Sequence, residues 1–244
     1  MGGFSFPWVA GQPVCQSPSS DGPTCYRRPF FNDTHASIDI MPRIDDYIAA
    51  CRLARAQLSA EPCERLSARS GFEPADPGAL RIPFLNRRYR LSCPGLEFTD
   101  ASADDKEVPL QEQVLILHYL QADGPAGPPG DWVAYREIPG AAFYFGAFVK
   151  RAVDPLKKAF GQDIAGFGRA AVRLRGEPLE VGDAGHEFRV FPKIPVRLVL
   201  YAGDEEFPAE ANILFDRSIG RMLSPEDVAW MAGMLVYRLI ALAR

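Results

Sequence analysis

The segment from residue 186 to residue 216 constrains the fold most, because its apolar residues recur with the period of β-strands. HEFRVF and VRLVLY each alternate between two faces, and NILFD adds a third short run. Pro192 and Pro195 lie between the first two runs, where proline is tolerated only at a sheet edge or a bend. The segment therefore predicts neighbouring strands of a sheet.

Helical patterns are interleaved with strands along the rest of the chain. Helices are predicted at residues 43–60, 109–122 and 140–173, the last broken near Pro155 and Gly161. A final helix opens at Ser224, with Pro225 in its first position and Asp227 completing a capping box. Further strands are predicted at residues 79–98, as a hairpin turning near Asn86-Arg87, and at residues 132–138. No regular βαβ rhythm appears, so we expect an α+β fold with a mostly antiparallel sheet packed with helices, in a single domain over residues 43–244.

Residues 1–42 read as an irregular extension. They are rich in Pro, Gly, Ser and Asp and carry no sustained period. They also hold six aromatic residues, too many for a solvated tail, so we expect them to pack on the domain or on a protein partner. The regular pattern begins near Met41, which is an alternative start of the chain.

Composition excludes several classes of protein. The net charge is −4 at pH 7, which leaves no broad positive field for nucleic acid. Neither a signal peptide nor a membrane-spanning apolar run is present, so we expect a cytoplasmic protein with no membrane partner. Five cysteines lack C-x-x-C spacing, and we expect isolated reduced thiols.

An acidic loop, Gly203-Asp-Glu-Glu-Phe-Pro-Ala-Glu210, is the most unusual local feature. Asp204 and Glu206 would point to one side, and Asp216 could approach them if the flanking strands pair. Such an oxygen cluster suits a divalent cation, with Glu205 or Glu210 as acid or base. The alternative is a solvated turn that keeps a sheet edge soluble. The common nucleotide-binding and hydrolase motifs are absent.

His118 is the candidate ligand in the apolar helix at residues 109–122. A neutral imidazole there could bind a metal or the metal of a tetrapyrrole, and the alternative is a hydrogen-bonded core histidine. Near residues 135–148, aromatic side chains surround an arginine and a glutamate. Arg136 could hold a carboxylate and Tyr144 could wall a flat ligand, although such aromatics also simply fill cores.

Several segments together carry a resemblance to one family. They are LHYL at 117–120, WVAYREIPG at 132–140, Pro155-Leu156, Gly182-Asp183, FRVFPKIPVRLVLYAGDEEFPAEANILFD at 188–216 and SPED at 224–227. Over roughly residues 44–243 the chain resembles the Domain of Unknown Function thirty-seven eighty-six family. The resemblance implies no activity and no catalytic residue. It implies an anaerobic setting, since the family looks like one found mainly in anaerobes. Some of its relatives are fused to an iron–sulfur domain similar to that of corrinoid/iron–sulfur proteins. This sequence has no such cysteine-rich segment.

Three functions follow as hypotheses. The first is a cofactor-binding or small-molecule-binding module, with a corrinoid or haem held by His118, Arg136 and Tyr144. The second is an enzyme that uses a divalent cation held by Asp204, Glu206 and Asp216. The third is a non-catalytic subunit that docks on a protein through residues 1–42.

Overall fold

The alternating segment forms the centre of a five-stranded antiparallel sheet. The computed structural model describes residues 44–76, 78–102, 106–122 and 130–244. The strand order is β5-β9-β8-β7-β6. The bounds are β5 (Trp132–Ala134), β6 (Glu177–Leu179), β7 (Ala184–Phe191), β8 (Ile194–Tyr201) and β9 (Glu210–Asp216). Strand β8 is buried along nearly its whole length, as a central strand covered on both faces requires.

A four-stranded antiparallel sheet precedes it in the chain, so we call the four-stranded sheet the first sheet and the five-stranded sheet the second sheet. The first sheet has the order β1-β2-β3-β4, with β1 (Glu73–Asp76), β2 (Ala79–Phe84), β3 (Arg87–Ser92) and β4 (Phe98–Asp100). The predicted hairpin is the β2–β3 pair, in which Phe84 lies opposite Arg87. Leu85, between them, takes a φ of 53°. The α+β prediction is therefore confirmed, with two antiparallel sheets in place of one.

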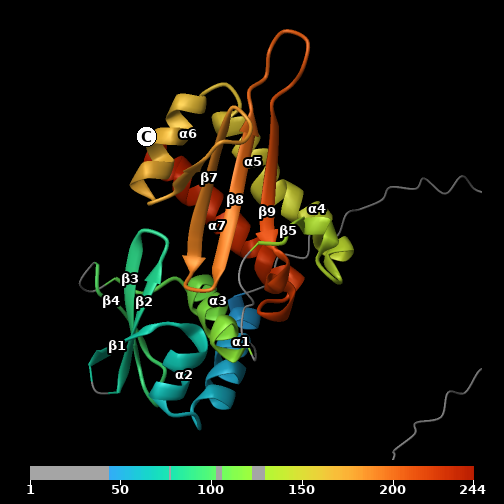
Figure 1. Cartoon of the computed structure of the whole chain (residues 1–244). Helices are drawn as coiled ribbons and strands as arrows, with labels where there is room; N and C mark the ends of the chain where they lie inside the picture. The colour runs from blue at the N-terminus through green and yellow to red at the C-terminus, as the bar shows by residue number, and fades with distance from the viewer. Residues whose placement is uncertain (1–43, 77, 103–105, 123–129) are drawn as a thin grey trace, which may run out of the picture. The chain divides into compact units, whose positions relative to one another are not determined.

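The helices pack around both sheets (Figure 1). They are α1 (Ile44–Leu58), α2 (Cys63–Ser70), α3 (Leu110–Gln121), α4 (Phe145–Phe148), α5 (Asp154–Phe160), α6 (Ile164–Arg173) and α7 (Pro225–Ala243). Helix α1 packs on α3, and α7 packs on α4, α5 and α6. The long apolar face of α7 is buried because it lies in the middle of this helical layer.

The predicted break near Pro155 has a clear structural form. Residues Val149–Val153 form a π-helical turn between α4 and α5. Pro155 has no N–H to donate to the carbonyl of Arg151, four residues earlier, so the regular α-helical ladder is interrupted there. Gly233 of α7 lies against that same carbonyl, where an added Cβ would come within 3.2 Å of the Arg151 oxygen.

Some elements differ from their prediction. The strand at 132–138 ends at Ala134 and continues as a 3₁₀ turn, Tyr135–Glu137. Helix α2 and strands β1, β4 and β6 are short and lack a clear period, so the sequence pattern missed them.

The prediction of isolated thiols is wrong for one pair of cysteines. Cys63, at the start of α2, and Cys93, after β3, form a disulfide with their Cα atoms 5.9 Å apart. They are separated by 30 positions in the sequence, and only the return of the β2–β3 hairpin brings them together. Cys51 is a buried free thiol, as expected.

The described residues lie in the compact unit Met41–Arg244. The predicted extension, residues 1–42, lies outside them, and so does the alternative start at Met41. Among the described helices, none is long and apolar enough to cross a membrane.

Candidate functional site

A pocket of about 200 Å³ lies between α1, α3 and the start of α7. Its apolar wall comes mainly from Ala50 of α1, Val114 and Leu115 of α3, and Met234 of α7. The polar lining is Asp46, Gln111, His118, Ser224, Glu226 and Asp227, and two aromatic rings, Tyr47 and Trp230, complete it. An apolar pocket with a few polar groups pointing into it is the usual form of a small-molecule site.

His118 is held in this pocket by a carboxylate. Its Nδ1 lies 3.0 Å from both carboxylate oxygens of Asp227. Among the described residues, Nε2 has no hydrogen-bond partner, and the imidazole lines the pocket. A carboxylate at Nδ1 fixes the orientation of a histidine ring and leaves Nε2 for a ligand or a proton transfer.

Asp227 also closes the N-terminus of α7. The Ser224 hydroxyl donates to Asp227 Oδ2 at 2.7 Å, and the Asp227 backbone N–H donates to Ser224 Oγ at 3.1 Å. This confirms Ser224 as the cap, Pro225 as the first helical residue and Asp227 as the capping-box partner. The orientation of His118 is thus tied to the first turn of α7.

The charge state of the site follows from these contacts. The hydrogen bond with Asp227 raises the pKa of His118 above its ordinary value, and burial opposes the shift only in part. The imidazole is therefore protonated over a wider pH range than a solvated histidine. Protonated, it presents an N–H donor at Nε2. Deprotonated, with Nδ1–H held by Asp227, it presents a lone pair there.

The aromatic part of the pocket is also anchored. Tyr47 meets Trp230 edge to face, with centroids 5.9 Å apart. The guanidinium of Arg151 lies 4.4 Å from the centroid of the Trp230 ring. Since Arg151 comes from the π-helical turn, that irregular turn helps to fix one wall of the pocket.

The predicted ligand residues are only partly brought together. Burial and the interaction with Glu226, a lining residue, raise the pKa of Tyr144. Tyr144 therefore lies next to the site of His118. Arg136, by contrast, is exposed and stacks 3.7 Å over the Phe145 ring, so it does not line the pocket.

Two of the predicted metal ligands, Asp204 and Glu206, share the acidic loop, but Asp216 lies far from them. Strands β8 and β9 do pair, but Tyr201 lies opposite Glu210, so the acidic loop is at one end of β9 and Asp216 is at the other. The six residue-to-residue steps along β9 separate its two ends by about 20 Å. Among the described residues, no group of three His, Cys, Asp or Glu side chains could hold a metal ion.

The carboxylates of that prediction have other roles. Asp204 Oδ1 accepts the backbone N–H of Glu206 and of Phe207, and these bonds lower its pKa. Asp216 is buried and accepts N–H groups from Gly130 and Ser218. Although burial raises the pKa of Asp216, these hydrogen bonds lower it by more. Both residues organise loops.

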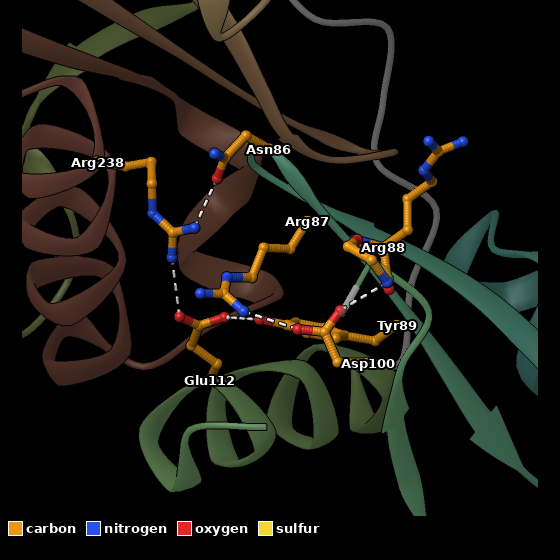
Figure 2. Close-up of polar contacts among 8 residues, drawn as sticks. Asn86, Arg87, Arg88, Tyr89, Asp100, Glu112 and Arg238 are labelled. Carbon is orange, nitrogen blue, oxygen red and sulfur yellow. Dashed lines mark hydrogen bonds and ion pairs between the residues drawn. The ribbon is translucent and has the colours of Figure 1, made fainter. Parts of the chain in front are cut away.

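A second polar cluster joins three elements below the first sheet. Figure 2 shows Arg238 of α7 reaching toward Asn86 and Glu112. Arg238 donates to Glu112 Oε1 at 3.0 Å and to Asn86 Oδ1 at 2.5 Å. The buried Tyr89 hydroxyl donates to Glu112 Oε2 at 2.5 Å, and beside it Arg87 donates to Asp100 at 2.7 Å.

This network, Asn86, Arg87, Tyr89, Asp100, Glu112 and Arg238, is internally satisfied. Two arginines balance two carboxylates, and both oxygens of Glu112 have donors. Neither Glu112 nor Tyr89 lines the His118 pocket. We conclude that it is a structural clamp between the first sheet, α3 and α7.

The clamp and the His118 pair bracket the pocket. His118–Asp227 joins the C-terminal half of α3 to the start of α7, and Glu112–Arg238 joins the start of α3 to the last third of α7. The pocket residues from α3 fall at positions 111–118, and those from α7 at positions 226–234. Helices α3 and α7 are therefore joined by two polar contacts, one toward each end of the pocket.

Sequence reasoning found His118 and missed most of its surroundings. The sequence pattern assigns Asp227 and Ser224 only to a helix cap and does not single out Tyr47. Trp230 was not singled out, although it lies three residues after Asp227 on the same helical face. The only available signal was that spacing, because the pairing of α3 with α7 spans 109 positions.

The comparisons with known proteins give one match. The model of the domain of unknown function DUF3786 matches residues 63–238. No curated protein and no solved structure matches the chain. The match spans well over half of the sequence and includes the clamp, His118 and Asp227. The chain therefore belongs to the DUF3786 family.

Proposed function

We propose that this chain is a small-molecule-binding module whose ligand contacts His118 Nε2 in the pocket between α1, α3 and α7. The observation that carries the proposal is the imidazole fixed through Nδ1 by Asp227, with Nε2 left to a pocket that has apolar and aromatic walls. A histidine that only filled the core would have neither a pocket nor an oriented second nitrogen.

The pocket volume sets the size of the ligand. An apolar cavity of about 150 Å³ can bind benzene, so a pocket of about 200 Å³ suits a small organic molecule. A small metabolite or fragment fits this volume, whereas a corrinoid or haem is far larger. The tetrapyrrole stays a prediction from the family resemblance, and the pocket favours a smaller ligand.

The test is nuclear magnetic resonance of the full chain labelled with ¹⁵N in histidine. The chain has only three histidines, and His186 is buried in the second sheet, so it serves as an internal control. The probes are a set of fragments with up to about ten non-hydrogen atoms, together with haem and cobalamin. We expect fragments to shift the His118 Nε2 resonance and to leave His186 unchanged.

Two matched variants separate the site from general effects. Asp227→Asn removes the carboxylate that orients His118, and binding should weaken by at least about tenfold. Asp163→Asn changes the N-cap aspartate of α6, whose carboxylate accepts the Gly166 N–H, and binding should stay as in the wild type. If no probe moves His118, or if both variants bind alike, the proposal is wrong.

A further inference from the structure

An apolar patch lies at one end of the second sheet, apart from the His118 pocket. It consists of Val181, Tyr201 and Phe207, which are 41%, 40% and 67% exposed. Val181 is in the turn before β7, Tyr201 is the last residue of β8, and Phe207 is in the loop between β8 and β9. We call these three residues the tip patch. Figure 1 shows the β8–β9 loop extending past the end of the sheet.

The two loops that carry the tip patch are joined to each other. The Asp183 N–H donates to the Leu200 carbonyl at 2.9 Å, and Asp183 Oδ2 accepts the Ala202 N–H at 2.7 Å. The turn that bears Val181 is therefore fastened to the end of β8. Tyr201 lies between Leu200 and Ala202, the two residues that Asp183 contacts. The three apolar residues therefore lie at one end of the sheet.

The base of the β8–β9 loop is also held in place. The Gly203 N–H donates to the Gly161 carbonyl at 3.2 Å, and the Gln162 side chain donates to the Gly203 carbonyl at 3.2 Å. At the tip, the Asp204 N–H donates to the Phe207 carbonyl at 2.9 Å. Phe207 is thus presented to solvent on a shaped loop, which lowers the entropy lost when a partner binds it.

The exposed apolar area of the tip patch can be compared with the area of known protein interfaces. An aromatic side chain offers roughly 150–250 Å², so Phe207 alone leaves more than about 100 Å² in water, and the whole tip patch leaves about 250 Å². This is below the roughly 800 Å² per partner of a stable complex, and it matches the centre of a small, transient interface.

Charge around the tip patch identifies the kind of partner. Exposed carboxylates surround it, namely Glu180, Asp204, Glu205, Glu206 and Glu210. None of them forms an ion pair with another described residue. Phosphate backbones and anionic lipid surfaces are repelled by such a rim, whereas lysine and arginine side chains are attracted.

We propose that the tip patch docks a protein segment in which apolar side chains are flanked by lysine or arginine. Phe207 enters an apolar pocket or covers an apolar side chain of the partner, and the carboxylate rim meets its basic residues. The contact is transient, and its affinity falls as salt increases. This docking is independent of the small-molecule site proposed above, because the tip patch and the His118 pocket share no residue.

The test uses a displayed library of random peptides selected on the immobilised full chain. Peptides that combine basic residues with aromatic or aliphatic ones should be enriched, and labelled copies should bind with dissociation constants in the micromolar range. Phe207→Ser should weaken their binding at least tenfold, and Glu205→Gln with Glu206→Gln should reduce its dependence on salt. Phe143→Ser is the matched control, because Phe143 is 78% exposed on another part of the chain.

Each contrary outcome overturns the proposal. Selection of neutral or acidic peptides, or of none, would show that the rim does not choose a basic partner. Equal binding by the Phe207 and Phe143 variants would place the contact elsewhere. Sedimentation of the unliganded chain tests whether a second copy of the chain occupies the patch instead. A dimer that is lost in Phe207→Ser would show that a second copy covers it.

Discussion

The clamp at Glu112 allows a sharp prediction of stability. Both carboxylate oxygens of this buried residue accept hydrogen bonds, one from the Tyr89 hydroxyl and one from Arg238. In Glu112→Ala, the fully buried Tyr89 hydroxyl loses its acceptor, which costs about 1–3 kcal/mol. Arg238 becomes a largely buried charge without its carboxylate, and breaking such a pair from one side costs about 3–5 kcal/mol in all. We therefore expect a loss of about 3–5 kcal/mol in the free energy of unfolding.

The assay is equilibrium unfolding in urea, followed by circular dichroism. Because small domains have only about 5–15 kcal/mol of stability, Glu112→Gln is measured as well, since it keeps an acceptor for Tyr89 and should lose less. The control is Glu73→Gln, which removes the exposed ion pair with Arg81 at 3.3 Å and should cost below about 0.5 kcal/mol.

A double-mutant cycle decides whether the pair itself is responsible. Arg238→Met together with Glu112→Ala should lose clearly less than the sum of the single losses, because the second change removes the charge that the first left unpaired. A loss below about 1 kcal/mol in Glu112→Ala, or strict additivity in the cycle, would refute the description of this network as a clamp.

Three further predictions concern pH and backbone geometry. Because the pKa of His118 is raised in the folded state, the interaction of His118 with Asp227 stabilises the protein fully below pH 6.5. This stabilisation is lost as the pH rises through the raised pKa. His118→Gln should then cost about 1–2 kcal/mol near pH 6 and little at pH 9, in urea unfolding across pH; a constant difference would contradict it. Burial lowers the pKa of His186, whose Nδ1 has no hydrogen-bond partner among the described residues, so the destabilisation caused by its burial appears as pH falls below 6.5. His186→Leu should stabilise the fold by about 1 kcal/mol at pH 7 and by more at pH 5, and a loss at both would show an unseen partner. Gly182 has a φ of +66°, and an added Cβ would come within 2.7 Å of the Leu200 carbonyl oxygen. Gly182→Ala should therefore lower the melting temperature by several degrees, and an unchanged value would mean that the turn relaxes freely.

The sequence predicted those parts of the fold whose period is long and regular. The β7, β8 and β9 strands, α1, α3 and the capped start of α7 all appear where the pattern placed them. Short elements such as α2 and β4 were missed, since three to eight residues hold too few repeats to define a period. The Cys63–Cys93 disulfide was missed for a different reason, because it depends on how a hairpin returns in space. A cytoplasmic location stays a prediction, and this disulfide is the observation that weighs against it.

The metal prediction shows how local reasoning fails over one strand. Asp204, Glu206 and Asp216 are close in sequence, and the two strands around the loop do pair. Antiparallel pairing, however, keeps the loop at one end and carries Asp216 away by the full length of β9. The few positions between the loop and Asp216 therefore form an extended strand, which separates Asp216 from the loop in space.

The His118 site shows how two ordinary features combine into one that neither indicates alone. A serine–aspartate cap is a routine start for a helix, and a histidine on an apolar helix is a routine core residue. An ionised carboxylate can accept about four hydrogen bonds, so Asp227 receives the Ser224 hydroxyl and still holds His118 Nδ1. The cap of α7 therefore also sets the angle of the imidazole in the pocket. Fraying of the first turn of α7 should release His118 as well, which couples the local stability of that turn to the shape of the binding site.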